Sequence, residues 1–134
     1  YYPSLIIFGK VLILIAGGGL GTLCRYLFST WCLEQFGPGF PYGTLGVNLI
    51  GCFLIGLLGG LPEIGIIIPL PVRLLLVVGF LGGFTTFSAF GLESFLLASD
   101  GQWRYALANI VLSCSLGFLA VWLGYRLGER WFGV

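Results

Sequence analysis

This chain of 134 residues has no histidine and few charged side chains. Histidine is absent and charged residues make up 8% of the sequence, whereas 58% of the residues are hydrophobic. A soluble domain of this size would lack the polar surface that keeps it dissolved. The net charge of +1, without clustered Lys and Arg, also excludes nucleic-acid binding through a basic surface. A lipid bilayer is therefore the expected surrounding of most of the chain.

The four cysteines indicate neither a metal site nor a disulfide framework. All of them lie within hydrophobic stretches and lack the paired spacing of metal ligands; they are Cys24, Cys32, Cys52 and Cys114. We expect them to act as small apolar residues.

Four apolar stretches are long enough to cross a bilayer, which takes about 20 residues of helix. The expected spans are residues 5–33, 41–61, 70–98 and 103–131, with short connections between them. Trp31, Trp103 and Trp131 lie near span ends, where an indole suits the headgroup level. The sequence thus predicts an all-α membrane protein with one transmembrane domain, residues 1–134.

Basic residues are distributed only slightly unevenly between the two sides of this arrangement. If the N-terminus faces the cytoplasm, the inner side carries Lys10, Arg73, Arg126 and Arg130, and the outer side Arg104 and Arg25. Such a weak bias permits insertion in both orientations. An antiparallel, dual-topology homodimer is therefore a hypothesis for this chain.

Glycines are abundant and many recur at a spacing of four residues, which lets helix backbones approach closely. The pairs are Gly17/Gly21, Gly56/Gly60, Gly79/Gly83 and Gly124/Gly128. In the third span, Gly82-Gly83 is followed by two β-branched threonines, and this combination weakens a helix near mid-membrane. We expect a broken third helix, interrupted at Gly82-Gly83. The alternative is a continuous helix whose glycines serve packing alone.

Uncharged polar side chains on three spans are the candidate lining of a pathway. Tyr105, Asn109 and Ser113 follow one helical stripe of the fourth span, Asn48 lies about two turns inside the second, and Ser88 follows the threonines. Interhelical hydrogen bonding alone would also explain a single buried Asn. Together these donors suit an anion that loses its hydration shell.

Phenylalanines accompany these donors in the third span, at positions 84, 87 and 90. The edge of a phenyl ring is weakly positive and can face an anion. Packing and lipid contact remain the alternative role for these rings.

Arg25 and Glu93 are the deepest charges, and both fall toward the same side of the membrane. We expect Glu93 to pair with Arg25. An equal alternative for Arg25 is to raise the anion concentration in a vestibule.

Three segments in matching order resemble the Fluc/CrcB family of fluoride ion channels, and the likeness covers nearly the whole chain. They are Gly21-Thr22-Leu23-Cys24-Arg25-Tyr26, Gly43-Thr44-Leu45-Gly46-Val47-Asn48 and Gly82-Gly83-Phe84-Thr85-Thr86-Phe87-Ser88-Ala89-Phe90. The resemblance implies no enzyme but a passive fluoride channel of the inner (plasma) membrane, which relieves the cytoplasm of fluoride. It also implies a second copy in inverted orientation and two pores per dimer.

The resemblance further implies roles for individual residues. A structural sodium ion (Na+) on the two-fold axis would be held by the backbone carbonyls of Gly82 and Thr85. Fluoride would meet the ring edges of Phe87 and Phe90, together with Asn48. The stripe of Tyr105, Asn109 and Ser113 would form a polar track.

This sequence departs from the family pattern at two of these positions. Asn109 stands where the family often has Ser, and Ala89 replaces a second hydroxyl after Ser88. We expect transport to persist, with an altered rate.

Two other functions compete with a channel. A small dual-topology exporter of drug-like cations has similar length, but it needs a buried carboxylate in the first span, and none is present there. A non-transporting scaffold would explain the glycines but not Asn48 or the polar stripe.

Overall fold

The computed structural model describes residues 3–133, which form helices joined by short turns and contain no strand. Four segments in this range are long and apolar enough to cross a membrane: Pro3–Phe36, Tyr42–Ile64, Leu70–Ser99 and Trp103–Phe132. They differ from the expected spans by only a few residues at each end. The predicted all-α membrane fold with four spans is confirmed.

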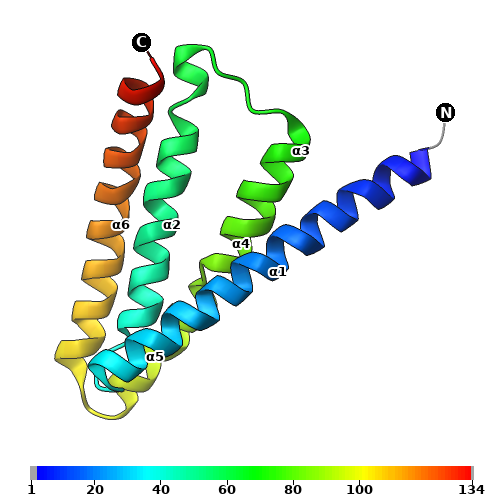
Figure 1. The fold of residues 1–134 in the computed structure, drawn as a ribbon. Helices are drawn as coiled ribbons and strands as arrows, with labels where there is room; N and C mark the ends of the chain where they lie inside the picture. Colours follow the sequence, from blue (N-terminus) through cyan, green and yellow to red (C-terminus); the bar gives the residue numbers. More distant parts are fainter. Residues whose placement is uncertain (1–2, 134) are drawn as a thin grey trace.

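The first, second and fourth spans are built around continuous helices. These are α1 (Pro3–Phe36), α2 (Tyr42–Gly59), which is followed by the short 3₁₀ turn η1 (Pro62–Ile64), and α6 (Trp103–Phe132). In Figure 1, α2 and α6 lie side by side, whereas α1 slants away from them toward its N-terminal end. At 1.5 Å per residue, α1 is roughly 50 Å long and exceeds a hydrocarbon core of about 30 Å.

Glycines allow the closest helix contacts, as their spacing predicts. A Cβ atom on Gly21 of α1 would overlap the carbonyl oxygen of Phe80 in the third span. A Cβ atom on Gly124 of α6 would overlap the carbonyl oxygen of Phe53 in α2. Only a residue without a side chain lets the backbones come this close. The α1 contact with the third span and the α2 contact with α6 are therefore both glycine-dependent.

The third span is divided into several pieces. It begins with α3 (Leu70–Arg73), continues as the π-helix η2 (Leu74–Leu81) and the short turn α4 (Gly82–Phe84), and resumes as α5 (Phe87–Ser99). Between α4 and α5, the backbone at Thr85 and Thr86 is extended, with ψ angles of 157° and 113°. The prediction of a broken third helix is confirmed.

The position of the break differs from the expected one. Gly82 and Gly83 are helical, and the chain leaves the helix two residues after them, at the threonines. The Thr85 hydroxyl donates to the Leu81 carbonyl at 2.9 Å, and the Thr86 hydroxyl accepts from the Ala89 N–H at 3.2 Å. A threonine hydroxyl can bond the backbone groups that a helix leaves without partners at its ends, and a glycine has no side chain to do so. The helix therefore ends at the threonines and not at the glycines. Gly83 instead packs against Gly18 of α1.

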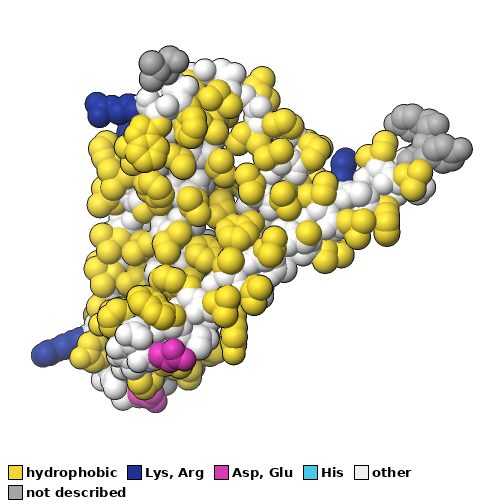
Figure 2. All heavy atoms as spheres, viewed as in Figure 1, with side chains coloured by type: hydrophobic (Ala, Val, Ile, Leu, Met, Phe, Trp, Pro, Cys, Tyr) yellow, Lys and Arg dark blue, Asp and Glu magenta, His cyan; other side chains and the backbone are white. Residues whose placement is uncertain are grey.

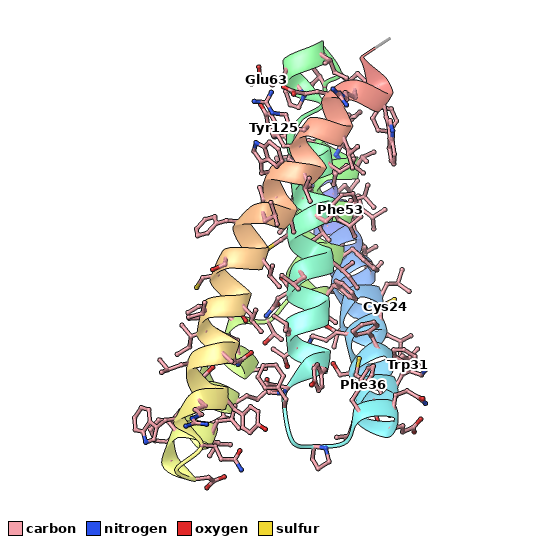
Figure 3. The ribbon with its side chains drawn as sticks, turned by 90° about the vertical axis from the view of Figure 1, so that its left-hand side faces the viewer. Cys24, Trp31, Phe36, Phe53, Glu63 and Tyr125 are labelled. Carbon is pink, nitrogen blue, oxygen red and sulfur yellow. The ribbon has the colours of Figure 1, made fainter. Side chains whose placement is uncertain are left out.

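Little of the side-chain surface is buried inside this chain. Among the described residues, the largest fully buried side chains are Val47 and Asn109. Apolar side chains cover most of the face shown in Figure 2, with charges near the two ends. In Figure 3, Trp31 and Phe36 lie toward one end and Glu63 and Tyr125 at the other. This surface is suited to lipid or to a second apolar chain.

Candidate functional site

Asn48 holds the extended segment of the third span. Its Nδ2–H donates to the Thr86 carbonyl at 3.1 Å, and its Oδ1 accepts from the Thr86 N–H at 2.8 Å. The side-chain amide thus satisfies both polar groups of one residue, which a helix would otherwise have satisfied. An amide Nδ2 carries two hydrogens, so one donor of Asn48 remains for another acceptor.

A cavity of about 440 Å³ lies beside this break. Its lining includes six of the residues singled out in the sequence, which come from α2, the third span and α6: Asn48, Gly82, Thr85, Phe87, Phe90 and Ser113. Cys52 and Cys114 also line it. The fold therefore brings together side chains from three spans, but of the predicted polar lining only Asn48 and Ser113 are among them.

Phe87 and Phe90 form an aromatic pair at the start of α5. Their ring centroids are 5.6 Å apart and the ring planes are inclined by 51°. Phe87 is 84% exposed, whereas Phe90 is half-buried. Neither ring is enclosed by this chain, so both offer an edge to whatever occupies the cavity.

The stripe on α6 is split between exposed and buried positions. Tyr105 is exposed and its ring packs against Phe40, with centroids 6.2 Å apart. Asn109 is fully buried and its Nδ2–H donates to the Ser94 hydroxyl of α5 at 2.9 Å. Ser113 lines the cavity. Asn109 thus links α6 to α5, whereas Tyr105 contacts Phe40 and Ser113 borders the cavity.

Three buried polar atoms have no hydrogen-bond partner within residues 3–133. They are the Ser113 Oγ, the Asn109 Oδ1 and the Glu93 Oε2. Leaving such atoms unsatisfied is costly, so water or a ligand is their expected partner. Of the three, only the serine hydroxyl can donate to an anion.

Ser88 lies at the surface beside the break. Its Oγ is 3.3 Å from the Thr86 Oγ1, and the side chain is exposed. Ser88 is absent from the cavity lining.

Gly82 and Thr85 both border the cavity. The N–H that would serve the Gly82 carbonyl in a continuous helix is that of Thr86, but it donates to Asn48 instead. A Cβ atom on Gly82 would meet only the Val77 carbonyl oxygen, at 3.9 Å. Packing within the described chain therefore does not require a glycine here, unlike at Gly83. Backbone carbonyl oxygens such as that of Gly82 are hard donors of the kind that bind alkali cations.

Arg25 and Glu93 do not pair among the described residues, contrary to the expectation for Glu93. The Arg25 Nε–H donates to the Gly83 carbonyl at 2.9 Å, and the Thr44 hydroxyl donates to Glu93 Oε1 at 2.8 Å. The guanidinium group and the carboxyl group are thus each bonded to a residue of a neighbouring helix and not to each other. Glu93 and Thr44 border a second hollow, of about 530 Å³, which Arg25 does not line.

Sequence reasoning missed three contributors to this region: Thr86, Ser94 and Thr44. The pair of adjacent threonines was a signal for Thr86, since Thr commonly caps helices. Ser94 and Thr44 carry no local signal, because their partners Asn109 and Glu93 are 15 and 49 residues away in the chain.

Known proteins are similar to this chain over most of its length. The family model "CrcB-like protein, Camphor Resistance (CrcB)" matches residues 12–125. A relative from Chloroflexus aurantiacus, named "Fluoride-specific ion channel FluC", is 47% identical over 92% of this chain and 98% of its own length. Relatives of the same name from Citrifermentans bemidjiense and Rhizobium meliloti are 46% and 45% identical, over 84% and 87% of this chain and 90% and 94% of their own lengths.

Fold and site together define a multi-pass helical membrane protein with an interrupted third span, which in bacteria lies in the plasma membrane. The chain belongs to the CrcB family. The resemblance noted in the three sequence segments is confirmed by this membership, and so is the prediction that the chain is not an enzyme, since its relatives are named as ion channels.

Proposed function

We propose that this chain is a passive, fluoride-selective channel that lets fluoride leave the cytoplasm. The observation that carries the proposal is the extended Thr85–Thr86 segment, held by Asn48 beside a cavity that Phe87, Phe90 and Ser113 also line. Non-helical backbone at membrane depth is tolerated where it is buried in protein or lines a wet cavity. The names of the relatives support fluoride as the ion.

The cavity offers an anion several weak donors in place of water. Within the described chain the Ser113 hydroxyl has no partner and Asn48 keeps one free N–H, and the two phenyl rings present edges. Neutral donors hold an anion loosely enough to release it again, which conduction requires. The ion then moves down its electrochemical gradient, and accumulated fluoride, which enters as the neutral acid at low pH, flows out.

The functional unit in this proposal is an antiparallel homodimer with two pores. Phe87 is 84% exposed and Tyr105 is 54% exposed, although both belong to the candidate pathway. A second copy in inverted orientation would cover them and complete each pore. The weak charge bias of the chain is compatible with insertion in both directions. A C-terminal tag found on one side of the membrane only would contradict this arrangement.

A structural sodium ion between the two copies fits the donors at the break. Gly82 and Thr85 border the cavity, and the Gly82 carbonyl oxygen lacks its helical partner because the Thr86 N–H donates to Asn48. One pair from each copy would supply four hard oxygen ligands close to the axis. The ion would hold the two broken helices together and would not take part in conduction.

A fluoride electrode and purified protein in liposomes test the proposal against its two competitors. A channel discharges a fluoride gradient rapidly once the membrane potential is shunted, whereas an exporter of drug-like cations or a scaffold leaves it in place. Phe87→Ala should suppress the flux, because it removes the ring at the cavity. Phe118→Ala is the matched control, since this ring is 78% exposed on α6 and absent from the cavity lining. Equal flux from both variants would refute the site.

A further inference from the structure

The two ends of the molecule differ in charge. The end where α6 terminates also contains η1, α3 and the N-terminal part of α1 (Figure 1). Its charged residues are Lys10, Arg73, Arg126 and Arg130 against Glu63 and Glu129, whereas the other side has Arg25 and Arg104 against Glu34, Glu93 and Asp100. One end is therefore basic and the other acidic.

A groove of about 470 Å³ runs along α6 at the basic end. Trp122, Arg126 and Arg130 line it at a spacing of four residues, together with Leu123, Leu127 and Glu129. Residues four apart lie above one another on a helix. The groove is thus apolar toward mid-membrane, and toward the end of the helix it carries two arginines and one glutamate, a net charge of +1.

The groove faces away from the rest of the chain. Gly124 and Gly128 turn the opposite side of α6 toward Phe53 and Leu57 of α2. At about 100° per residue, Trp122 and Arg126 each lie roughly 160° from Gly124 around the helix axis. The Arg126 side chain is 62% exposed and Trp122 is 55% exposed. No described element of this chain covers them.

The arginines keep donors that the protein does not use. Arg126 Nη1 lies 3.2 Å from Glu129 Oε2, a single contact that leaves most of its five N–H groups free. Arg130 forms no ion pair in the described part of the chain. A phosphate group accepts several hydrogen bonds from guanidinium groups.

We propose that this groove binds an anionic phospholipid. Arg126 lies about 6 Å nearer the helix end than Trp122, which matches a molecule with a phosphate outside and acyl chains inside. The apolar surface continues inward to Phe118, which is 78% exposed. A free phosphate would use the arginines but not this apolar surface. Basic pockets at a membrane boundary are known sites for anionic headgroups.

Quenching of tryptophan fluorescence by brominated lipids tests this site without any measurement of transport. A Trp31→Phe/Trp103→Phe background leaves Trp122 and Trp131, both at the basic end. In vesicles, brominated phosphatidylglycerol should quench them more strongly than brominated phosphatidylcholine at the same mole fraction. Each arginine should enrich the anionic lipid on the order of fivefold. Equal quenching by the two lipids would overturn the proposal.

Variants and a competing anion sharpen the result. Arg126→Gln/Arg130→Gln should abolish the preference and Arg126→Lys/Arg130→Lys should keep most of it, while Arg104→Gln at the acidic end should leave it unchanged. A preference that persists in the Gln pair contradicts the site.

Inorganic phosphate, compared with chloride at equal ionic strength, should have no effect on the quenching. If phosphate erased the preference for the anionic lipid, the groove would be a site for the free anion, and the lipid proposal would be wrong.

Discussion

The two halves of the third span are held in place by different forces. Before the break, the chain packs backbone to backbone on α1, where Gly17, Gly21 and Gly83 leave no room for side chains. After the break, side-chain hydrogen bonds hold α5 and its cap residue Thr86. They come from Asn48 and Thr44 of α2 and from Asn109 of α6. The first half depends on shape and on one hydrogen bond, from Arg25 to the Gly83 carbonyl, whereas the second depends on polar groups that an ion could also use.

This difference separates residues that the fold needs from residues that transport needs. Substitutions in the glycine contact should remove the protein itself, whereas polar substitutions after the break should alter flux while the helices remain. The largest effect is expected at Gly21.

Gly21→Leu should prevent recovery of folded protein. Its Cβ would overlap the Phe80 carbonyl oxygen, and the whole helix would have to move, at a cost of about 3 kcal/mol or more. Gly19→Leu is the matched control, because nothing lies within 4 Å of a Cβ atom there. Size-exclusion chromatography after detergent extraction measures both. Similar yields of monodisperse protein would contradict the close contact.

Asn48→Asp should reduce fluoride flux on the order of tenfold to a hundredfold. The change removes the Nδ2 donors and places a negative charge at the cavity, and a hydrogen bond to a charged group contributes about 1.5–3 kcal/mol. Gln102→Glu makes the same chemical change at an exposed position and should leave flux near wild type. Wild-type flux from Asn48→Asp, measured with a fluoride electrode, would show that this region is structural like the first half.

Arg25→Gln should lower the free energy of unfolding by about 1.5–3 kcal/mol, because it removes the charged donor to the Gly83 carbonyl. The remaining flux should depend on ionic strength as in the wild type, since Arg25 is bound to backbone and absent from both cavities. A vestibule role predicts the opposite result, a flux that loses part of its salt dependence. Flux at low and high salt therefore decides between the two roles.

The smallest effect is expected for the buried bond between Asn109 and Ser94. A double-mutant cycle of Asn109→Ala and Ser94→Ala should give a coupling energy of about 0.5–1.5 kcal/mol, as for other hydrogen bonds between membrane helices. Thermal unfolding in detergent measures it. Additive effects would mean that this bond does not hold α5 to α6.

Much of the fold could be predicted because the relevant signals are local. Runs of apolar residues about 20 long locate spans without knowledge of their neighbours. The weakness of the third helix was also readable, since Gly82-Gly83 and the two threonines are adjacent. Its exact position was not, because Gly83 remains helical while it packs on α1, and the threonines find carbonyl and amide partners nearby.

The candidate site was predictable as a set of residue types and less so as a set of contacts. Asn48, Phe87, Phe90 and Ser113 do line one cavity. Asn109, however, is directed to Ser94, and Arg25 to Gly83, over separations of 15 and 58 residues. Periodicity places a residue on a face of its helix, but it does not reveal which helix that face meets.

By itself, the sequence determined that the protein lies in a lipid bilayer, that it has four spans, that the third span is weak as a helix, and to which family it belongs. These properties follow from hydrophobicity, backbone propensity and motifs, which neighbouring residues carry. Only the tertiary structure decided where the break falls, which polar groups meet at it and that Arg25 and Glu93 stay apart. Those outcomes depend on which donor comes within about 3 Å of which acceptor, and that is settled by how the helices pack.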